Sequence, residues 1–307
     1  MQQKIRWTDE KPALLWILAF LSTLAIAVYQ RMTGPSYPIR GRENVSGRVI
    51  TYKWVTSHEQ GRPLPVGITV SGGEIRATLF FKRHTARDEW SVVPMLPGGD
   101  GTLIAAIPGQ PAAGKVLYLV RVRDDEGRET VLHRGKTVVA RFRGNVPTAF
   151  LLLHVVFMFL GIWLAIRTGL EALKRAGKPE KLIPWTMAVT FIGGMILGPI
   201  VQKYAFGAFW TGFPAGTDLT DNKTLLAFIF WLMAFLLRNK SRWWAVAAAI
   251  LMIIVYLIPH SVAGSELDYA SGRLKNVYTL NPESGERSFI SSGPNSGCFP
   301  LHAPDLR

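Results

Sequence analysis

Two histidines are the residues of this chain whose type is best suited to hold a redox cofactor. His154 lies in the apolar stretch LLLHVVFMF, and His260 ends the apolar stretch LIPH. Imidazole nitrogens are axial ligands of haem iron and titrate near neutral pH. On neighbouring helices the pair could therefore bind haem or quinol. The alternative is structural, with His154 bonded to a neighbouring helix and His260 at the membrane interface. No CxxCH motif for covalent haem is present.

Four carboxylates form a second candidate, because oxygen ligands suit a hard cation such as Ca²⁺. Asp218 and Asp221 follow one apolar region, and Glu266 and Asp268 follow another. We expect both pairs on the same side of a membrane, although no EF-hand spacing links them. Cys298 is the only cysteine. It excludes a disulfide or a multi-thiolate metal site within the chain.

A stretch rich in aromatic residues, YAFGAFWTGFPAGTDLTDNKT at 204–224, separates two apolar runs. Aromatic side chains concentrate where a bilayer meets water, and Gly and Pro let a chain turn back. We expect Thr220 or Asp221 to cap the helix that follows. The stretch is therefore interpreted as an interfacial loop that can contact a partner. Its aromatic residues are Tyr204, Phe206, Phe209, Trp210 and Phe213.

Five apolar runs must position these residues. They cover 12–29, 148–166, 182–201, 224–237 and 243–259, and the mean hydropathy of the chain is +0.19. Most runs have the length of about 20 residues that spans a bilayer, whereas the fourth is short. The first resembles a signal peptide, but acidic residues precede it, so we interpret it as an uncleaved anchor. In the third run, Gly194 and Gly198 form a small-xxx-small pair that favours close helix packing.

Basic residues give these runs an orientation. Lys and Arg cluster in 1–11, 167–181 and 238–242, and such clusters stay on the cytoplasmic side. The N-terminus is therefore expected inside, and 31–147, 204–223 and the tail from 260 outside. Half of the net charge of +14 is then explained by orientation and by contact with anionic lipid, rather than by nucleic acid.

Residues 45–143 alternate short β-prone segments with turn signals such as SGGE, PGGDG and DDEGRE. In KVLYLVRVR (115–123), apolar and basic residues alternate, which is typical of a half-buried strand. Seven or eight such strands predict an immunoglobulin or fibronectin type III sandwich. A copper-binding sandwich would need a cysteine that this region lacks. Residues 31–147 carry eight more basic than acidic residues, which favours an acidic partner or a lipid surface.

The predicted fold is thus a five-span helical bundle with an extracytoplasmic β-sandwich. Its parts are an N-terminus (1–11), a first span (12–30), the sandwich (31–147), four spans (148–260) with an outer loop (202–223), and a loose tail (261–307). Walker, GxSxG, HExxH and Rossmann motifs are absent. We therefore expect a non-catalytic subunit or scaffold of a complex in a bacterial cytoplasmic membrane, with other membrane proteins as partners. The alternatives are a haem or quinol protein, and then a transporter or sensor.

Overall fold

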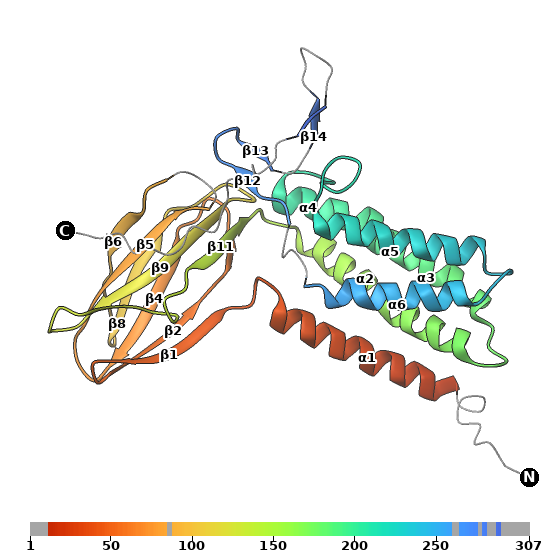
Figure 1. The fold of residues 1–307 in the computed structure, drawn as a ribbon, viewed down its shortest axis with the longest axis horizontal. Helices are drawn as coiled ribbons and strands as arrows, with labels where there is room; N and C mark the ends of the chain where they lie inside the picture. The colour runs from red at the N-terminus through yellow and green to blue at the C-terminus, as the bar shows by residue number, and fades with distance from the viewer. Residues whose placement is uncertain (1–11, 85–87, 260–263, 276–277, 281–286, 290–307) are drawn as a thin grey trace, which may run out of the picture. The chain divides into compact units, whose positions relative to one another are not determined.

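The computed structural model describes residues 12–84, 88–259, 264–275, 278–280 and 287–289. It divides into two compact units, shown in Figure 1. The helical unit contains 12–37 and 144–259. The β unit contains 38–143 together with the segment that starts at Ser265. The β unit is therefore inserted between the first and second helices, and a segment that follows the last helix returns to it.

The helical unit consists of apolar helices that pack around a shared core. Four helical segments are long and apolar enough to cross a membrane, and α6 is shorter at 15 residues. The short run was expected to be 224–237, but α5 begins at Leu219 and has 18 residues. The bounds are α1 Pro12–Thr33, α2 Thr148–Leu173, α3 Ile183–Thr190 continued by η2 Phe191–Leu197 and α4 Gly198–Phe206, α5 Leu219–Leu236 and α6 Trp243–Leu257, with a short turn η1 at Pro179–Lys181.

The third helical segment widens into a π-helical turn over η2. Gly198 N–H donates to the carbonyl of Gly193, five residues back. Glycine allows this turn to lie against its neighbours: a Cβ at Gly194 would come within 2.8 Å of Thr224 in α5. Gly198 has looser surroundings, with no neighbour nearer than 3.6 Å. Only the first glycine of the expected pair therefore packs tightly. Widened turns of this kind often occur at functional positions.

The β unit is built from two sheets that enclose one core. The strand order is β1-β2-β4-β8-β7 in the five-stranded sheet and β3-β11-β9-β5-β6 in the six-stranded sheet, where β10 pairs with β9. The bounds are β1 Ile39–Val45, β2 Arg48–Trp54, β3 Ser57–Glu59, β4 Leu64–Ser71, β5 Arg76–Arg83, β6 Ser91–Pro94, β7 Leu96–Gly99, β8 Thr102–Ile107, β9 Lys115–Arg123, β10 Glu129–Val131 and β11 Val138–Arg143.

Alternation along the strands supplies this core. In β9, Val116, Tyr118, Val120 and Val122 are buried, whereas the residues between them are more exposed. Trp54 from β2 is also buried, and its ring lies edge-on to Tyr118 from the other sheet at 5.9 Å. Side chains of a strand alternate between its two faces. The inward-facing apolar side chains of each sheet therefore fill the space between the two sheets.

The segment after α6 packs on the β unit. Strands β12 Leu267–Asp268 and β13 Arg273–Leu274 form a small hairpin, and β14 Tyr278–Leu280 pairs with β15 Arg287–Phe289. Leu267 N–H donates to the carbonyl of Ala113, and Arg141 donates to the carbonyl of Ser265. A loose tail was expected from 261 onward. For residues 265–275 that expectation was wrong, because their backbone and polar groups have partners on the sandwich.

Candidate functional site

His154 lies in α2 beside the widened turn of the third segment. Its Nδ1 is 2.9 Å from the carbonyl oxygen of Gly193. Because a carbonyl only accepts, Nδ1–H is the donor and Nε2 keeps the lone pair. This is the helix-to-helix bond that the structural interpretation expects. His260 lies outside the described residues, so shared ligation by the two histidines stays a prediction.

Asp218 and Asp221 shape the start of α5. Asp218 is the N-cap, and its carboxylate accepts from Thr220 N–H at 2.7 Å. The expected caps, Thr220 and Asp221, instead lie in the first turn. Asp221 is buried and accepts from the N–H of Thr211 at 2.6 Å and from Gln202 Nε2 at 3.0 Å. Both carboxylates therefore fix the loop 207–218 against the helix ends.

Glu266 and Asp268 belong to the β unit and hold the returning segment. The two oxygens of Glu266 lie 2.8 Å from Nδ1 of His84 and 3.0 Å from Nζ of Lys115, and Nζ of Lys275 is 3.6 Å away. Asp268 accepts from Ser271 Oγ at 2.8 Å, and this hydrogen bond lowers the pKa of Asp268. Among the described residues, no three His, Cys, Asp or Glu side chains are grouped so that they could hold a metal ion.

Glu266 and its basic partners are largely buried, which strengthens the contact between the segment 265–275 and the sandwich. The side chains of Lys115 and Glu266 keep only 15% and 11% of their exposure. Burial lowers the pKa of Lys115, although Glu266 opposes that shift. Tyr269 donates to the carbonyl of Lys115 at 3.1 Å, and burial raises its pKa to about 12. The guanidinium of Arg83 lies 4.9 Å from the centre of the Tyr269 ring. We call Glu266, His84, Lys115, Lys275 and Tyr269 the clasp.

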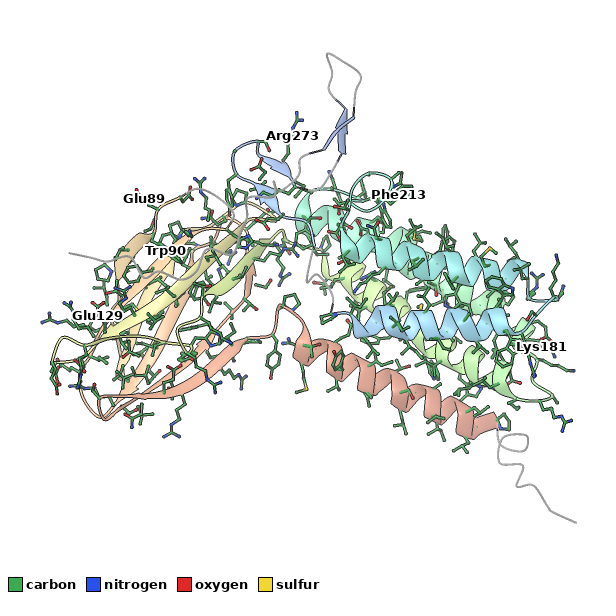
Figure 2. All side chains as sticks on the ribbon, viewed as in Figure 1. Glu89, Trp90, Glu129, Lys181, Phe213 and Arg273 are labelled. Carbon is green, nitrogen blue, oxygen red and sulfur yellow. The ribbon has the colours of Figure 1, made fainter. Side chains whose placement is uncertain are left out.

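The aromatic loop, which is the segment 207–218 between α4 and α5, lies at one end of the helical unit. Figure 2 shows Phe213 at this end and Lys181, from the loop between α2 and α3, at the opposite end. Phe209 and Phe213 are exposed at 57% and 67%. Trp210 Nε1 donates to the carbonyl of Phe213 at 3.0 Å, and Tyr204 stacks on Phe150 at 5.9 Å. The arrangement separates an aromatic end from a basic end. Phe206 ends α4 and is half-buried.

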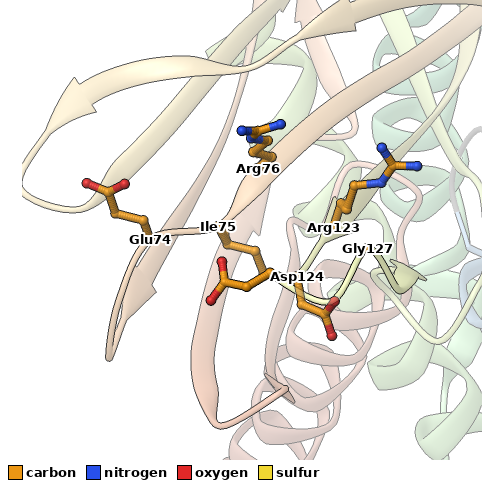
Figure 3. Close-up of a pocket in the computed structure, with 7 residues that line it drawn as sticks. Glu74, Ile75, Arg76, Arg123, Asp124 and Gly127 are labelled. Atoms are coloured by element: carbon orange, nitrogen blue, oxygen red, sulfur yellow. The ribbon is translucent and has the colours of Figure 1, made fainter.

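A recess of about 430 Å³ opens at the turns that join β4 to β5 and β9 to β10 (Figure 3). Its lining combines Glu74, Asp124 and Asp125 with Arg76 and Arg123. The Asp124 carboxylate is already engaged by Ser46 Oγ at 2.5 Å and by Arg128 Nε at 2.8 Å. These bonds lower its pKa far below the ordinary 3.8. Asp124 thus joins the β9–β10 turn to Ser46, which lies between β1 and β2.

Sequence reasoning missed an ion pair inside α2. Residues 167–181 were assigned to a loop, but α2 continues to Leu173. Arg167 is buried, its Nη2 lies 2.7 Å from Glu171, and its guanidinium is 5.1 Å from the centre of the Trp16 ring. The i,i+4 spacing of Arg167 and Glu171 was the available signal, because such pairs stabilise a continuing helix. The clasp had no comparable signal, since Glu266 and Lys115 are separated by 151 residues.

Comparisons with known proteins identify no family. No family model matches the chain, and no curated protein sequence matches it. Among solved structures, a family 76 glycoside hydrolase from a bovine Bacteroides thetaiotaomicron strain is similar to 83% of this chain at 10% identity. The match covers 70% of that protein, with a TM-score of 0.20. At this score the similarity supports no inference about fold or function.

Proposed function

We propose that the chain is a non-catalytic subunit or scaffold of a membrane complex, in which five crossing helices hold an extracytoplasmic β unit for partner docking. The segment that returns from α6 to the β unit is the observation that carries this proposal. The β unit is joined to α1, to α2 and, through 265–275, to the end of α6. Three chain connections to the helices, rather than one, favour a docking platform over a module on a single linker.

Connectivity supports five crossings, including the short α6. The end of α1, the start of α2 and the end of α6 all connect to one β unit, so they belong on one side of the membrane. If α2, the third segment and α5 each cross, the chain begins α6 on the opposite side. It then has to cross again to reach Ser265. A helix of 15 residues spans about 22 Å, and a bilayer can thin around a short helix at modest cost.

The strand order supports an immunoglobulin-type sandwich for the β unit. That architecture orders one sheet A-B-E-D and the other C-F-G. With β2, β4, β7 and β8 as A, B, D and E, the order β2-β4-β8-β7 is the same. With β5, β9 and β11 as C, F and G, the second sheet also corresponds, and β1 is an added edge strand. Sandwiches of this class are common in cell-surface domains, in keeping with a docking role.

The candidate polar residues also favour a structural role. His154 bonds to Gly193, Asp218 and Asp221 fix a helix start, and Glu266 joins the clasp. Broad apolar faces remain for lipid or neighbouring subunits, including Leu152 of α2 at 61% exposure and Ile17 of α1 at 55%. Partners that contact such faces within a bilayer are other membrane proteins. A bacterial cytoplasmic membrane fits the distribution of basic loops.

The test is isolation of the tagged full chain from its native membranes in polymer nanodiscs, followed by quantitative mass spectrometry and a visible absorption spectrum. We expect the same partner subunits at constant stoichiometry in independent preparations, and no absorption band. Substituting exposed Phe213 by Ser should reduce the recovery of a partner that binds the aromatic loop. The matched substitution Phe191→Ser lies on an apolar helix face away from that loop.

Two outcomes would overturn the scaffold proposal. A chain that is recovered alone from native membranes has no complex to support. A Soret band that disappears in His154→Ala would establish the haem alternative, which the free lone pair on Nε2 permits.

A further inference from the structure

Three cations form one exposed patch on the outer face of the five-stranded sheet. Arg40 of β1 pairs directly with Lys53 of β2, and Arg42 pairs with Thr51 two residues along. All three cations are exposed. Residues at positions i and i+2 of a strand share a face, so Arg40, Arg42 and Lys53 point the same way. We call these three residues the β1–β2 cationic face.

The charges on this face have no protein counter-charge in the part of the chain that the structure describes. No carboxylate lies within ion-pair distance of Arg40, Arg42 or Lys53 there. The nearby Glu43 accepts instead from Tyr52 Oη at 2.6 Å. Like charges directly opposite each other on paired strands destabilise a sheet. Arg40 and Lys53 therefore repel each other across the two strands, and a bound anion would relieve this repulsion.

The six-stranded sheet shows the contrast. Arg76 and Arg123 are also directly opposite each other there, on β5 and β9. Glu129 lies 3.2 Å from Arg123 and 2.8 Å from Arg121, so that face carries its own counter-charge. The lack of counter-charge is therefore specific to the β1–β2 cationic face. It does not simply follow from the basic composition of the β unit.

The chain limits how far this face can be from the end of α1. β1 begins at Ile39, and only five residues separate it from Thr33, where α1 ends. Arg40 therefore lies at most about 25 Å along an extended chain from the end of α1. The end of α1 and the linker carry residues typical of a membrane interface: the guanidinium of Arg31 in α1 lies 5.4 Å from the centre of the Tyr37 ring, and Tyr37 is 41% exposed. Anionic head groups are thus within reach of the face wherever α1 spans a bilayer.

We propose that the β1–β2 cationic face docks on the phosphates of anionic phospholipids in the leaflet from which α1 emerges. The inference rests on the proposed function insofar as α1 must be inserted in a membrane. Juxtamembrane Lys and Arg residues are each attracted to anionic lipid, and three of them shift the docked population by on the order of 100-fold at low salt. A second protein is the less favoured occupant, because the short linker between α1 and β1 keeps the face permanently close to lipid head groups.

The experiment uses the full chain in nanodiscs, with Cys298→Ser removing the native thiol. A fluorophore is attached to Thr51→Cys, which is exposed and opposite Arg42. The discs contain phosphatidylcholine alone, or phosphatidylcholine and phosphatidylglycerol in equal parts, with a trace of lipid that carries a quencher on its head group. The readout is the degree of quenching.

We expect quenching to rise severalfold when phosphatidylglycerol is present and to fall again in high salt, because salt screens exposed charges. The variant Arg40→Glu/Arg42→Glu/Lys53→Glu should remove the rise. The matched control Arg76→Glu/Lys82→Glu/Arg123→Glu changes the charge equally on the other sheet and should keep it. Circular dichroism confirms that each variant retains its β structure.

Quenching that is the same in both lipid mixtures, or that is lost equally in both triple variants, would overturn the inference. Quenching that changes only when an acidic protein is added would identify a protein as the occupant instead. All three outcomes leave the proposed function standing as long as the chain resists alkaline extraction from the discs. A chain that is extracted would contradict membrane insertion itself, and with it the proposed function.

Discussion

At the scale of single residues, the polar groups of this protein act mainly as connectors between distant parts of the chain. Glu266 joins three basic side chains from three parts of the β unit, and Asp124 ties the β9–β10 turn to Ser46 in the β1–β2 turn. A charged group is costly to bury without a partner. Removing one member of such a pair therefore destabilises the folded state, because the other member stays buried without a counter-charge. Two predictions follow from these two carboxylates.

Glu266→Gln should release the segment 265–275 from the sandwich. The substitution leaves the largely buried Lys115 without its counter-charge. We expect the folded state to lose about 2 kcal/mol of stability, less than for a fully buried pair, because both side chains keep some exposure. Amide hydrogen exchange on the full chain should show faster exchange across β12 and β13, with the sandwich core unchanged. Glu59→Gln removes an exposed pair with Arg62 and serves as the control, with little expected effect. Equal exchange in wild type and Glu266→Gln would rule the clasp out as the main anchor.

Asp124→Asn should reduce the dependence of sandwich stability on acid. The folded pKa of Asp124 is lowered below 3.8 by hydrogen bonds from Ser46 and Arg128. The folded state therefore binds fewer protons than the unfolded state. The stabilisation is present above about pH 4 and is lost as pH falls through the folded pKa. Thermal unfolding between about pH 5 and pH 2 should show a shallower decline for Asp124→Asn than for wild type. Parallel curves would contradict this assignment.

At the scale of elements, small residues decide how closely the helices approach. A Cβ at Gly169 of α2 would lie 2.6 Å from Cβ of Ala249 in α6, nearer than real side chains approach. At Gly161, about two turns earlier in the same helix, the nearest atoms would be 3.5 Å distant, an ordinary contact. The two glycines thus provide a matched pair within one helix.

Gly169→Ala should destabilise the helical unit by about 1–2 kcal/mol, because α2 and α6 have to separate. Gly161→Ala should be neutral or stabilising by up to about 1 kcal/mol, because alanine favours the helix and space is available. Unfolding of the full chain in mixed micelles, followed by helical circular dichroism, measures both. A loss in Gly161→Ala as large as that in Gly169→Ala would show that the close approach of α2 and α6 is not what matters.

Local patterns predicted the elements better than the contacts between them. The apolar runs located the helices and alternation located strands such as β9, because both patterns arise within short stretches of chain. The length of α5 was underestimated, since its first turn is polar and is capped by Asp218. The clasp could not be predicted, because pairing Glu266 with Lys115 depends on how the sandwich folds. The bond from His154 to Gly193 depends similarly on a widened turn.

At the scale of the whole chain, the proposed membrane insertion sets one requirement: the end of α1, the start of α2 and the end of α6 must lie on one side of the membrane, because all three connect to the β unit. The β unit is inserted between α1 and α2, and its last segment comes from α6. The aromatic loop 207–218 should then share a side with the β unit, and the loops at 174–178 and 238–242 should lie opposite. Docking of partners, the lipid contact and the orientation all depend on this arrangement.

Cysteine accessibility in sealed native vesicles of known orientation tests this arrangement most directly. With Cys298→Ser as the background, single cysteines replace the exposed residues Thr51 in the β unit, Thr217 in the aromatic loop, and Ala176 and Asn239 in the basic loops. We predict that an impermeant maleimide labels Thr51→Cys and Thr217→Cys from the extracytoplasmic side. The other two should react there only after the vesicles are opened. Labelling of Thr51→Cys and Asn239→Cys from the same side of sealed vesicles would contradict the five-crossing account.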